Sequence, residues 1–188
     1  CWNSLAKRKH PDSDTGYGDD LSPMRRAVAF CRDIKASKQV AAQFPDLVDG
    51  LSNLENDDTT DNLRVECSHV DGTMNAAVRA QAMEWLKEGA GTDEEPICRI
   101  LSNARCLSEG VDVPTLDAVL FLAPRKSQVD VIQAVGRVMR RAEGKDFGYI
   151  ILPVAVPAGM APERALDDNT RFQVVWKVLK ALRAHDER

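Results

Sequence analysis

The most informative property of this sequence is a set of missing patterns. No Gly-x-x-x-x-Gly-Lys-Ser/Thr loop occurs in its 188 residues, so the chain has no phosphate cradle of that type and no hydroxyl placed there to anchor magnesium. The five cysteines are odd in number and form no Cys-x-x-Cys pair, which argues against a zinc site or a disulfide framework. We therefore expect free thiols and a reducing, cytoplasmic location.

Long apolar runs are missing as well. The longest run, residues 150–156, is interrupted by Pro153 and is much shorter than the roughly 18 residues that a membrane span needs. We expect no membrane partner. The sequence starts at Cys1 without an initiator methionine or a basic and apolar leader, which indicates a segment excised from a larger protein.

The charge of the chain is unevenly distributed. The net charge is -4, yet residues 45–63 hold six acidic residues and no Lys or Arg, whereas residues 125–145 hold six basic residues against two acidic ones. Local charge attracts a polyanion more effectively than the total charge does, so a basic face for nucleic acid is compatible with the composition. An apolar content of 44% is enough for one domain with a substantial core.

Beyond residue 24, short apolar runs alternate with amphipathic patterns. The predicted strands cover residues 27–31, 64–70, 98–102, 117–122 and 147–152, and the predicted helices cover residues 34–44, 75–88, 127–139 and 169–184. This alternation predicts an α/β fold with a mainly parallel sheet flanked by helices on both faces. Ligands of such sheets bind at the carboxyl ends of the strands.

We divide the chain into three parts. Residues 1–23 are polar and are interpreted as a connector from a preceding domain, and residues 24–160 form the α/β unit. Residues 161–188 form a C-terminal helix that packs on this or the next domain, with an apolar stripe of Phe172, Val175, Trp176, Leu179 and Leu182. The acidic residues 45–63 are predicted to form a long loop.

The predicted helix 127–139 begins with a recognisable signal and has one face suited to burial. Ser127, with Asp130 three positions later, resembles a capping box. The apolar side chains of Ile132, Val135 and Met139 share a stripe that we expect to pack against the sheet.

A second face of the same helix carries a chemical pattern. Gln133, Arg137 and Arg140 fall at i, i+4 and i+7 and share one side, with Gly136 beside them to allow close approach of a ligand. Arginine is always charged and forks onto phosphate oxygens, so this face suits a polyphosphate. The alternative is an ordinary solvated basic helix.

Upstream, the predicted strand 98–102 ends at Ser102 and Asn103, where a hydroxyl and an amide can bond a backbone phosphate. Gly110 relieves a turn and Pro114 ends it, with Asp112 between them. A Gly-x-Asp sequence on its own is usually only a turn.

These two segments, residues 102–114 and 133–141, resemble motifs V and VI of superfamily 2 helicases. Residues 133–140 match the family pattern His/Gln-x-x-Gly-Arg-x-x-Arg at every fixed position. The resemblance implies a RecA-like, three-layer second lobe of an ATP-driven motor. It implies that Arg137 and Arg140 are arginine fingers for the γ-phosphate of ATP, and that Gln133 and Gly136 belong to the ATP-binding surface.

By the same resemblance, the motif V segment touches both ligands. Ser102 and Asn103 would contact the nucleic-acid backbone, and Gly110 and Asp112 would lie at the ATP ribose. Arg105 would contact nucleic acid or the other lobe, with an internal salt bridge as its alternative.

Two weaker segments extend the resemblance. Residues 27–33 resemble motif IV, and residues 69–73 resemble the segment whose backbone amides meet a phosphate, which adds Arg32 and Thr73 to the predicted nucleic-acid contacts. Glu109 stands where RNA-directed relatives usually carry arginine, which favours DNA. The wording of residues 103–114 and 124–127 and of the tail 176–186 is similar to the type ISP restriction–modification enzymes.

The predicted function is therefore half of a DNA helicase or translocase. DNA and the N-terminal RecA-like lobe of the same polypeptide are the expected partners, and ATP and Mg²⁺ would be held mainly by that lobe. The segment alone is predicted to be inactive. One alternative is a degenerate lobe that serves as a nucleic-acid or protein docking module, whereas a nicotinamide-binding domain is set aside because residues 16–18 lack the third glycine.

Overall fold

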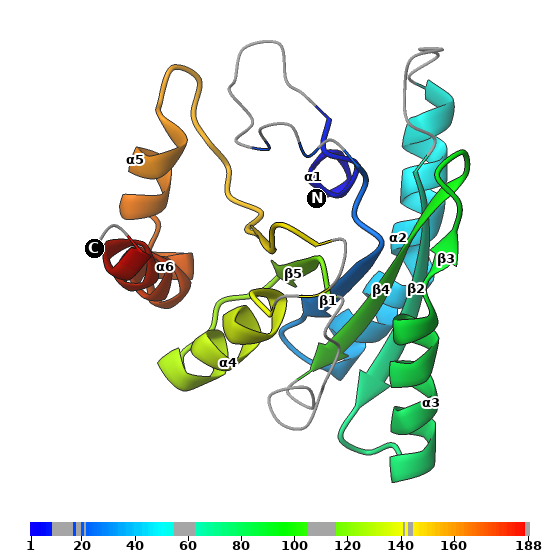
Figure 1. Ribbon diagram of the computed structural model, residues 1–188. Helices are drawn as coiled ribbons and strands as arrows, with labels where there is room; N and C mark the ends of the chain where they lie inside the picture. Colours follow the sequence, from blue (N-terminus) through cyan, green and yellow to red (C-terminus); the bar gives the residue numbers. More distant parts are fainter. Residues whose placement is uncertain are drawn as a thin grey trace.

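The computed structural model describes residues 1–8, 17, 20, 22–54, 63–104, 116–140, 142 and 145–186. Figure 1 shows its elements, which are α1 (Trp2–Leu5), β1 (Arg26–Phe30), α2 (Ile34–Leu54), β2 (Arg64–Asp71), α3 (Ala76–Glu88), β3 (Ala90–Gly91), β4 (Pro96–Ala104), β5 (Ala118–Phe121), α4 (Gln128–Val138), β6 (Tyr149–Ile151), α5 (Pro162–Asp167), a 3-10 turn (Thr170–Phe172) and α6 (Gln173–Asp186). Within these ranges, no helix combines the length and the apolar character that crossing a membrane requires.

The strands form one sheet in the order β2-β4-β1-β5-β6, and every pair along this path is parallel. The short β3 pairs antiparallel with β4. The predicted α/β architecture with a mainly parallel sheet is confirmed. A parallel sheet requires crossover connections that place helices on its faces, which is why strands and helices alternate along the chain.

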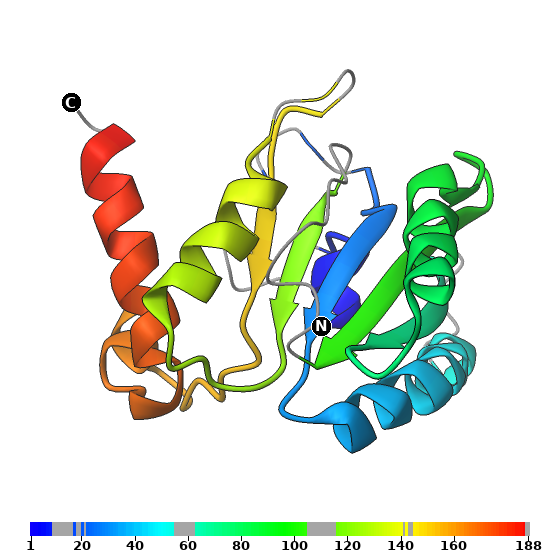
Figure 2. The same cartoon turned by 90° about the horizontal axis from the view of Figure 1, so that it is seen from below.

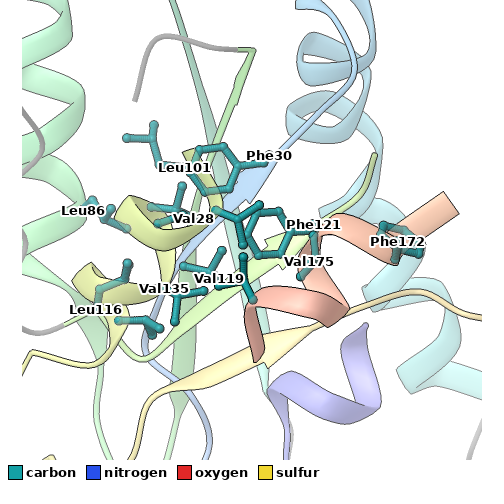
Figure 3. Close-up of a cluster of buried hydrophobic side chains, with 14 of the residues drawn as sticks. Val28, Phe30, Leu86, Leu101, Leu116, Val119, Phe121, Val135, Phe172 and Val175 are labelled. Atoms are coloured by element: carbon teal, nitrogen blue, oxygen red, sulfur yellow. The ribbon is translucent and has the colours of Figure 1, made fainter. Parts of the chain in front are cut away.

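Helices cover both faces of the sheet, and consecutive side chains of a strand point to opposite faces. Val28 and Phe30 of β1 belong to one core cluster with residues of α3, α4 and α6, whereas Ala27 and Ala29 belong to a second cluster with residues of α1 and α2. Figure 2 shows helices on both sides of the sheet. In the first cluster, drawn in Figure 3, the rings of Phe30 and Phe121 stack with centroids 5.5 Å apart.

Helix α2 corrects one prediction. It continues through Pro45 to Leu54, so the first part of the predicted loop 45–63 is helical, and residues 55–62 lie outside the described residues. Proline inside a helix costs about 3 kcal/mol relative to alanine. The side chain of Val48 is buried in the second core cluster and that of Phe44 packs against it, which offsets this cost.

The polar composition of residues 1–23 predicts a connector, but three apolar side chains of this segment are buried. Trp2, Leu5 and Ala6 are buried in the second core cluster, and the backbone N–H of Met24 donates to the carbonyl of Leu5 at 2.9 Å. The boundary drawn at residue 23 stays a prediction, but Trp2, Leu5 and Ala6 belong to the hydrophobic core of this fold.

The C-terminal region departs from the single predicted helix 169–184. The side chain of Asn169 accepts a hydrogen bond from the backbone N–H of Phe172, which starts a 3-10 turn that leads into α6. The short helix α5 was not predicted. Phe172, Val175 and Val178 are buried in the cluster that includes α4, so this end of the chain packs on the α/β unit itself.

Shortening Leu5 to alanine tests whether the N-terminal residues belong to the fold. Leu5 is fully buried, so Leu5→Ala should lower the free energy of unfolding by about 2–5 kcal/mol through lost burial and a residual cavity. Leu47→Ala is the matched control, because Leu47 is 61% exposed and should change stability by roughly 0.5 kcal/mol or less. Urea denaturation of the three chains gives both values, and equal stabilities would contradict the assignment.

Candidate functional site

The ends of four strands line up along one edge of the sheet. In the register of β1 with its neighbours, Phe30 lies opposite both Asn103 and Phe121, and in the register of β2 with β4, Asp71 lies opposite Ala104. The arrowheads of β2 and β4 point to the lower side of Figure 1, where α3 begins. The segments that follow these strands therefore leave the sheet along one common edge.

Helix α4 starts where the sequence predicts. The side chain of Ser127 accepts a hydrogen bond from the backbone N–H of Asp130 at 3.2 Å, and the helix begins at Gln128. The buried stripe differs from the predicted one, because Ile132 and Met139 are each 51% exposed. The side chains that pack on the sheet are those of Val131, Ala134, Val135 and Val138, at i, i+3, i+4 and i+7.

The opposite side of α4 carries Gln133, Gly136 and Arg137, and Arg140 follows two residues after the helix ends at Val138. Gln133, Gly136 and Arg140 are exposed, and Arg137 is half-buried. A Cβ atom built on Gly136 would meet no atom within 4 Å, so open space lies above this position. Burial lowers the pKa of Arg137, and so does repulsion from the neighbouring Arg140 guanidinium. An anion between them would relieve this repulsion.

The end of α4 is fixed by groups that the sequence analysis did not identify. The ammonium of Lys145 donates hydrogen bonds to the carbonyls of Val138 and, at 3.1 Å, of Arg140. A cation at a helix C-terminus satisfies its last carbonyls and opposes the helix dipole. Gly148 packs against the same end, because a Cβ atom there would overlap the Val138 carbonyl. Arg140 is thus held from its backbone side.

Arg32 lies at the predicted edge, just after β1. Its Nε donates to the carboxylate of Asp33 at 2.8 Å, and its side chain remains 81% exposed. The other oxygen of Asp33 accepts from the backbone N–H of Ala36 at 2.8 Å and caps the start of α2. The guanidinium is therefore available at the surface beside the first turn of this helix.

The turn after β2 places Thr73 at the surface, but its donors are in use. The backbone N–H of Thr73 donates to Asp71 at 2.7 Å, and its hydroxyl donates to the same carboxylate oxygen. Asn75 caps the following helix α3 by accepting from the N–H of Val78 at 2.9 Å. The donors that this turn offers to a phosphate are those of the first turn of α3 rather than those of Thr73.

A buried polar network lies behind this turn, and the sequence analysis missed it. The Nε2 of His69 lies 2.8 Å from Asp71 Oδ2, and its Nδ1 lies 2.7 Å from the Ser37 hydroxyl. The Oγ atoms of Ser37 and Ser102 lie 3.0 Å apart, and Ser102 Oγ lies within hydrogen-bond distance of the carbonyls of Ser37, at 2.9 Å, and of Ser68, at 3.2 Å. In the sequence, the network is visible only as serine, histidine and aspartate residues on segments that are otherwise apolar.

This network corrects the roles assigned to Ser102 and Asn103. Both residues are fully buried, so neither side chain can contact DNA as predicted. Strand β4 continues to Ala104, beyond the predicted end at residue 102, and both residues pair there between β1 and β2. The side-chain amide of Asn103 donates to the carbonyl of Ala29 at 3.2 Å. Arg105, Gly110 and Asp112 lie outside the described residues.

The exposed face of α4 fits a polyphosphate better than a metal ion. Two guanidiniums and an amide supply hydrogen-bond donors and positive charge beside a glycine. Among the residues that the structure describes, no group of three or more His, Cys, Asp or Glu side chains is placed to hold a metal. In this part of the chain, groups that could bind the phosphates of ATP are present and a ligand set for Mg²⁺ is not.

A family model described as the helicase conserved C-terminal domain matches residues 20–142, which contain β1 to β5, the turn after β2 and the whole of α4. The chain belongs to this family. Its RecA-like fold and its resemblance to superfamily 2 helicases are thereby confirmed.

Individual relatives of this helicase domain agree. A protein of African swine fever virus, strain Badajoz 1971 Vero-adapted, named as a probable helicase, is 43% identical over 134 residues, which are 71% of this chain and 13% of the viral protein. The corresponding protein of the Kenyan isolate is 32% identical over 131 residues, 70% of this chain and 13% of its own length.

A solved structure extends the similarity to nearly the whole domain. It is that of the ATP-dependent type ISP restriction–modification enzyme LlaBIII bound to DNA, with 44% identity and a TM-score of 0.75, and it covers 97% of this chain and 11% of that one. The helicase domain thus spans only a small fraction of the length of the proteins that it matches.

Asp71 should give the helicase domain a specific pH dependence. Hydrogen bonds from the Thr73 hydroxyl, the His69 ring and the Thr73 amide hold the pKa of the Asp71 carboxyl well below its usual range. Its contribution to stability is present above the unfolded-state pKa, about 3.9, and is lost as the pH falls from there through the folded-state pKa. Asp71→Asn should therefore be less stable than wild type at neutral pH, and the difference should shrink below about pH 4.

Urea unfolding at several pH values, followed by circular dichroism, measures this difference. Asp93→Asn is the matched control, because Asp93 is fully exposed and its ion pair with Arg25 is expected to contribute little. A destabilisation of Asp71→Asn that stays constant down to acidic pH would contradict the assignment.

Proposed function

We propose that this domain is the second motor lobe of an ATP-dependent DNA helicase or translocase. It would supply Arg137 and Arg140 to ATP bound on an N-terminal RecA-like lobe of the same polypeptide. The observation that carries the proposal is the two-sided character of α4. Its apolar side is buried on the sheet, and this fixes Gln133, Gly136 and the arginine pair on the open side.

The two arginines suit the stabilisation of a transferring phosphoryl group. A guanidinium keeps its charge at any physiological pH and donates two parallel hydrogen bonds to phosphate oxygens. Arginine fingers of this kind contribute roughly 10³–10⁵ in rate. ATP would supply the phosphoryl group, and Mg²⁺ would be held by the other lobe. On this side, Arg137 and Arg140 would bind the γ-phosphate oxygens, and Gly136 would leave room for their approach.

The edge of the sheet at the carboxyl ends of β1, β2 and β4 would hold the DNA backbone. Arg32, after β1, and the first turn of α3, after β2, lie at the ends of the two strands that flank β4. One offers an exposed guanidinium and the other offers backbone N–H groups, and neither reads a base. Binding should therefore tolerate any sequence and weaken steeply with salt. The similarity to a DNA-bound type ISP enzyme supports DNA as the ligand.

A second candidate function is a docking module without motor activity. Val129, Ile132 and Met139 of α4 are 61%, 51% and 51% exposed, which favours contact between this helix and another folded unit. In the motor proposal, these same side chains would form the contact with the ATP-binding lobe. A docking module has no requirement for the arginines, and this difference separates the two functions.

Removing Arg140 from the complete motor polypeptide should abolish ATP turnover. We expect Arg140→Ala to lower DNA-stimulated kcat by about 10³-fold or more with DNA affinity retained, and Arg140→Lys to recover little, because lysine lacks the planar fork. Arg164→Ala is the matched control, since Arg164 is exposed on α5, and it should leave kcat unchanged. Steady-state hydrolysis and DNA titration of each variant provide the measurements.

Either result for Arg140→Ala decides between the candidates. Unchanged turnover would overturn the arginine-finger role and leave docking as the function of α4. Loss of turnover together with loss of DNA binding would show that the substitution disrupts the lobe, and Arg137→Ala would then provide the independent test of the finger role.

The chain by itself should not hydrolyse ATP. Its sequence has no phosphate-binding loop of the Gly-x-x-x-x-Gly-Lys-Ser/Thr type, so half of the catalytic groups would be missing. Purified chain, assayed with ATP, Mg²⁺ and DNA, should release phosphate at the background rate. Turnover above background that Arg140→Ala removes would contradict the two-lobe proposal.

A further inference from the structure

The network around His69 joins three elements of the sheet edge. Ser37 comes from the first turns of α2, His69 and Asp71 come from β2, and Ser102 comes from β4. Ser37 and Ser102 are fully buried, and the side chains of His69 and Asp71 are 9% and 2% exposed. Burying so many polar groups costs free energy that apolar side chains would not require, and a fully connected network imposes one arrangement in return.

We propose that His69 is a positioning residue for DNA binding. Its two ring nitrogens hold the turn at residues 72–75 and the start of α2 in a fixed relation, so that the phosphate contacts after β1 and β2 act as one rigid unit. This inference rests on the proposed DNA contact of the same edge. It adds a buried residue that touches no ligand and sets the geometry of those that do.

The direction of the hydrogen bonds supports this role. The Asp71 carboxylate only accepts, so the Nε2 of His69 carries a proton and donates to Oδ2. The other carboxylate oxygen, Oδ1, accepts from the amide and the hydroxyl of Thr73. One carboxylate is thus shared between the imidazole and the turn. Without the imidazole, Asp71 could rotate about its side chain and carry the turn with it.

The other ring nitrogen reaches the second contact. Nδ1 lies 2.7 Å from the hydroxyl of Ser37. Ser37 lies one helical turn after Asp33, and Asp33 caps α2 and pairs with Arg32. The Ser102 hydroxyl donates to the Ser37 carbonyl and locks this part of α2 to β4. The guanidinium of Arg32 and the first turn of α3 are thereby tied to the same central strand.

The order Ser37–His69–Asp71 also has the composition of a nucleophilic triad, but its environment excludes that chemistry. Ser37 is fully buried inside α2, and its hydroxyl lies against the side chains of His69 and Ser102. A substrate carbonyl cannot approach it, and a nucleophile must lie within reach of its substrate. Treatment of the chain with a fluorophosphonate probe should leave Ser37 unlabelled.

Hydrogen exchange tests the positioning directly. His69→Phe keeps a ring of similar size and removes both nitrogens, so backbone amides of residues 72–78 should exchange at least several-fold faster than in the wild-type chain. His69→Gln retains one donor and one acceptor and should restore part of the protection. Tyr149→Phe is the matched control, because it removes the single bond of Tyr149 to Asp20 at the other end of the strands and should leave residues 72–78 unchanged.

DNA affinity tests the consequence. Fluorescence anisotropy of the wild-type chain with a short labelled single strand and with the matching duplex gives the reference Kd. We expect His69→Phe to weaken binding by about tenfold, comparable to one lost hydrogen bond to a charged group, and His69→Gln to recover part of it. The slope of log K against log salt should stay unchanged in His69→Phe, because the displaced donors are neutral amides, and should fall by about 0.7–0.9 in Arg32→Gln.

The outcomes separate this inference from the proposed function. A wild-type chain that binds neither DNA form would overturn the DNA contact, and the inference with it. If the wild type binds and His69→Phe binds equally with unchanged exchange, the positioning role is wrong while the motor proposal stands. Should His69→Phe fail to fold, Ser37→Ala removes the Nδ1 partner with a smaller change, and the same two measurements on it decide the question.

Discussion

The parallel pairing of β4 with both of its neighbours is the constraint on which the rest of this structure depends. Backbone hydrogen bonds fix the register on each side, so Asp71, Ala104, Phe30 and Phe121 end their strands along one line. The proposed DNA contacts follow from that line, whereas Arg137 and Arg140 lie at the far end of α4, which meets Gly148 just before β6. Helix α2, helix α3 and the segment before α4 all begin at the line of strand ends, and the apolar side chains of each helix are buried in one of the two core clusters.

Much of this arrangement could be predicted from the sequence, because the patterns involved are local. The alternation of strands and helices identifies a parallel sheet, and Ser127 with its neighbours marks the start of α4 within one residue. The spacing of Gln133 and Arg137 requires only helical geometry to place them on one side, whereas Arg140 follows the end of α4 and its place depends on the turn after Val138. The apolar stripe was displaced by one residue because Val131 and Ile132 are equally apolar, and only the sheet decides which of them is buried.

The failures share a different cause, which is contact between residues distant in the sequence. Ser102 was predicted to be an exposed hydroxyl because its neighbours indicate the end of a strand. Strand β4 instead continues between β1 and β2 and buries this residue. Residues 45–63 were predicted to form a loop, yet α2 continues to Leu54 and Val48 is buried in a core cluster that includes residues of the N-terminal segment. His69 belongs to the segment 69–73 that resembles a phosphate-contacting segment, but its buried network was not predicted, since its partners lie on α2 and on its own strand at a spacing that no motif describes.

The close approach of Gly148 to the end of α4 has a consequence for how substitutions in this domain would be tolerated. Gly148 is not among the predicted phosphate contacts, and its backbone adopts no conformation that requires glycine. Any side chain there, however, would displace the Val138 carbonyl, and with it the turn that carries Arg140. A survey of all single substitutions would therefore rank this position with the arginines. Such a survey would identify the residues that hold the site in place as well as the residues that form it.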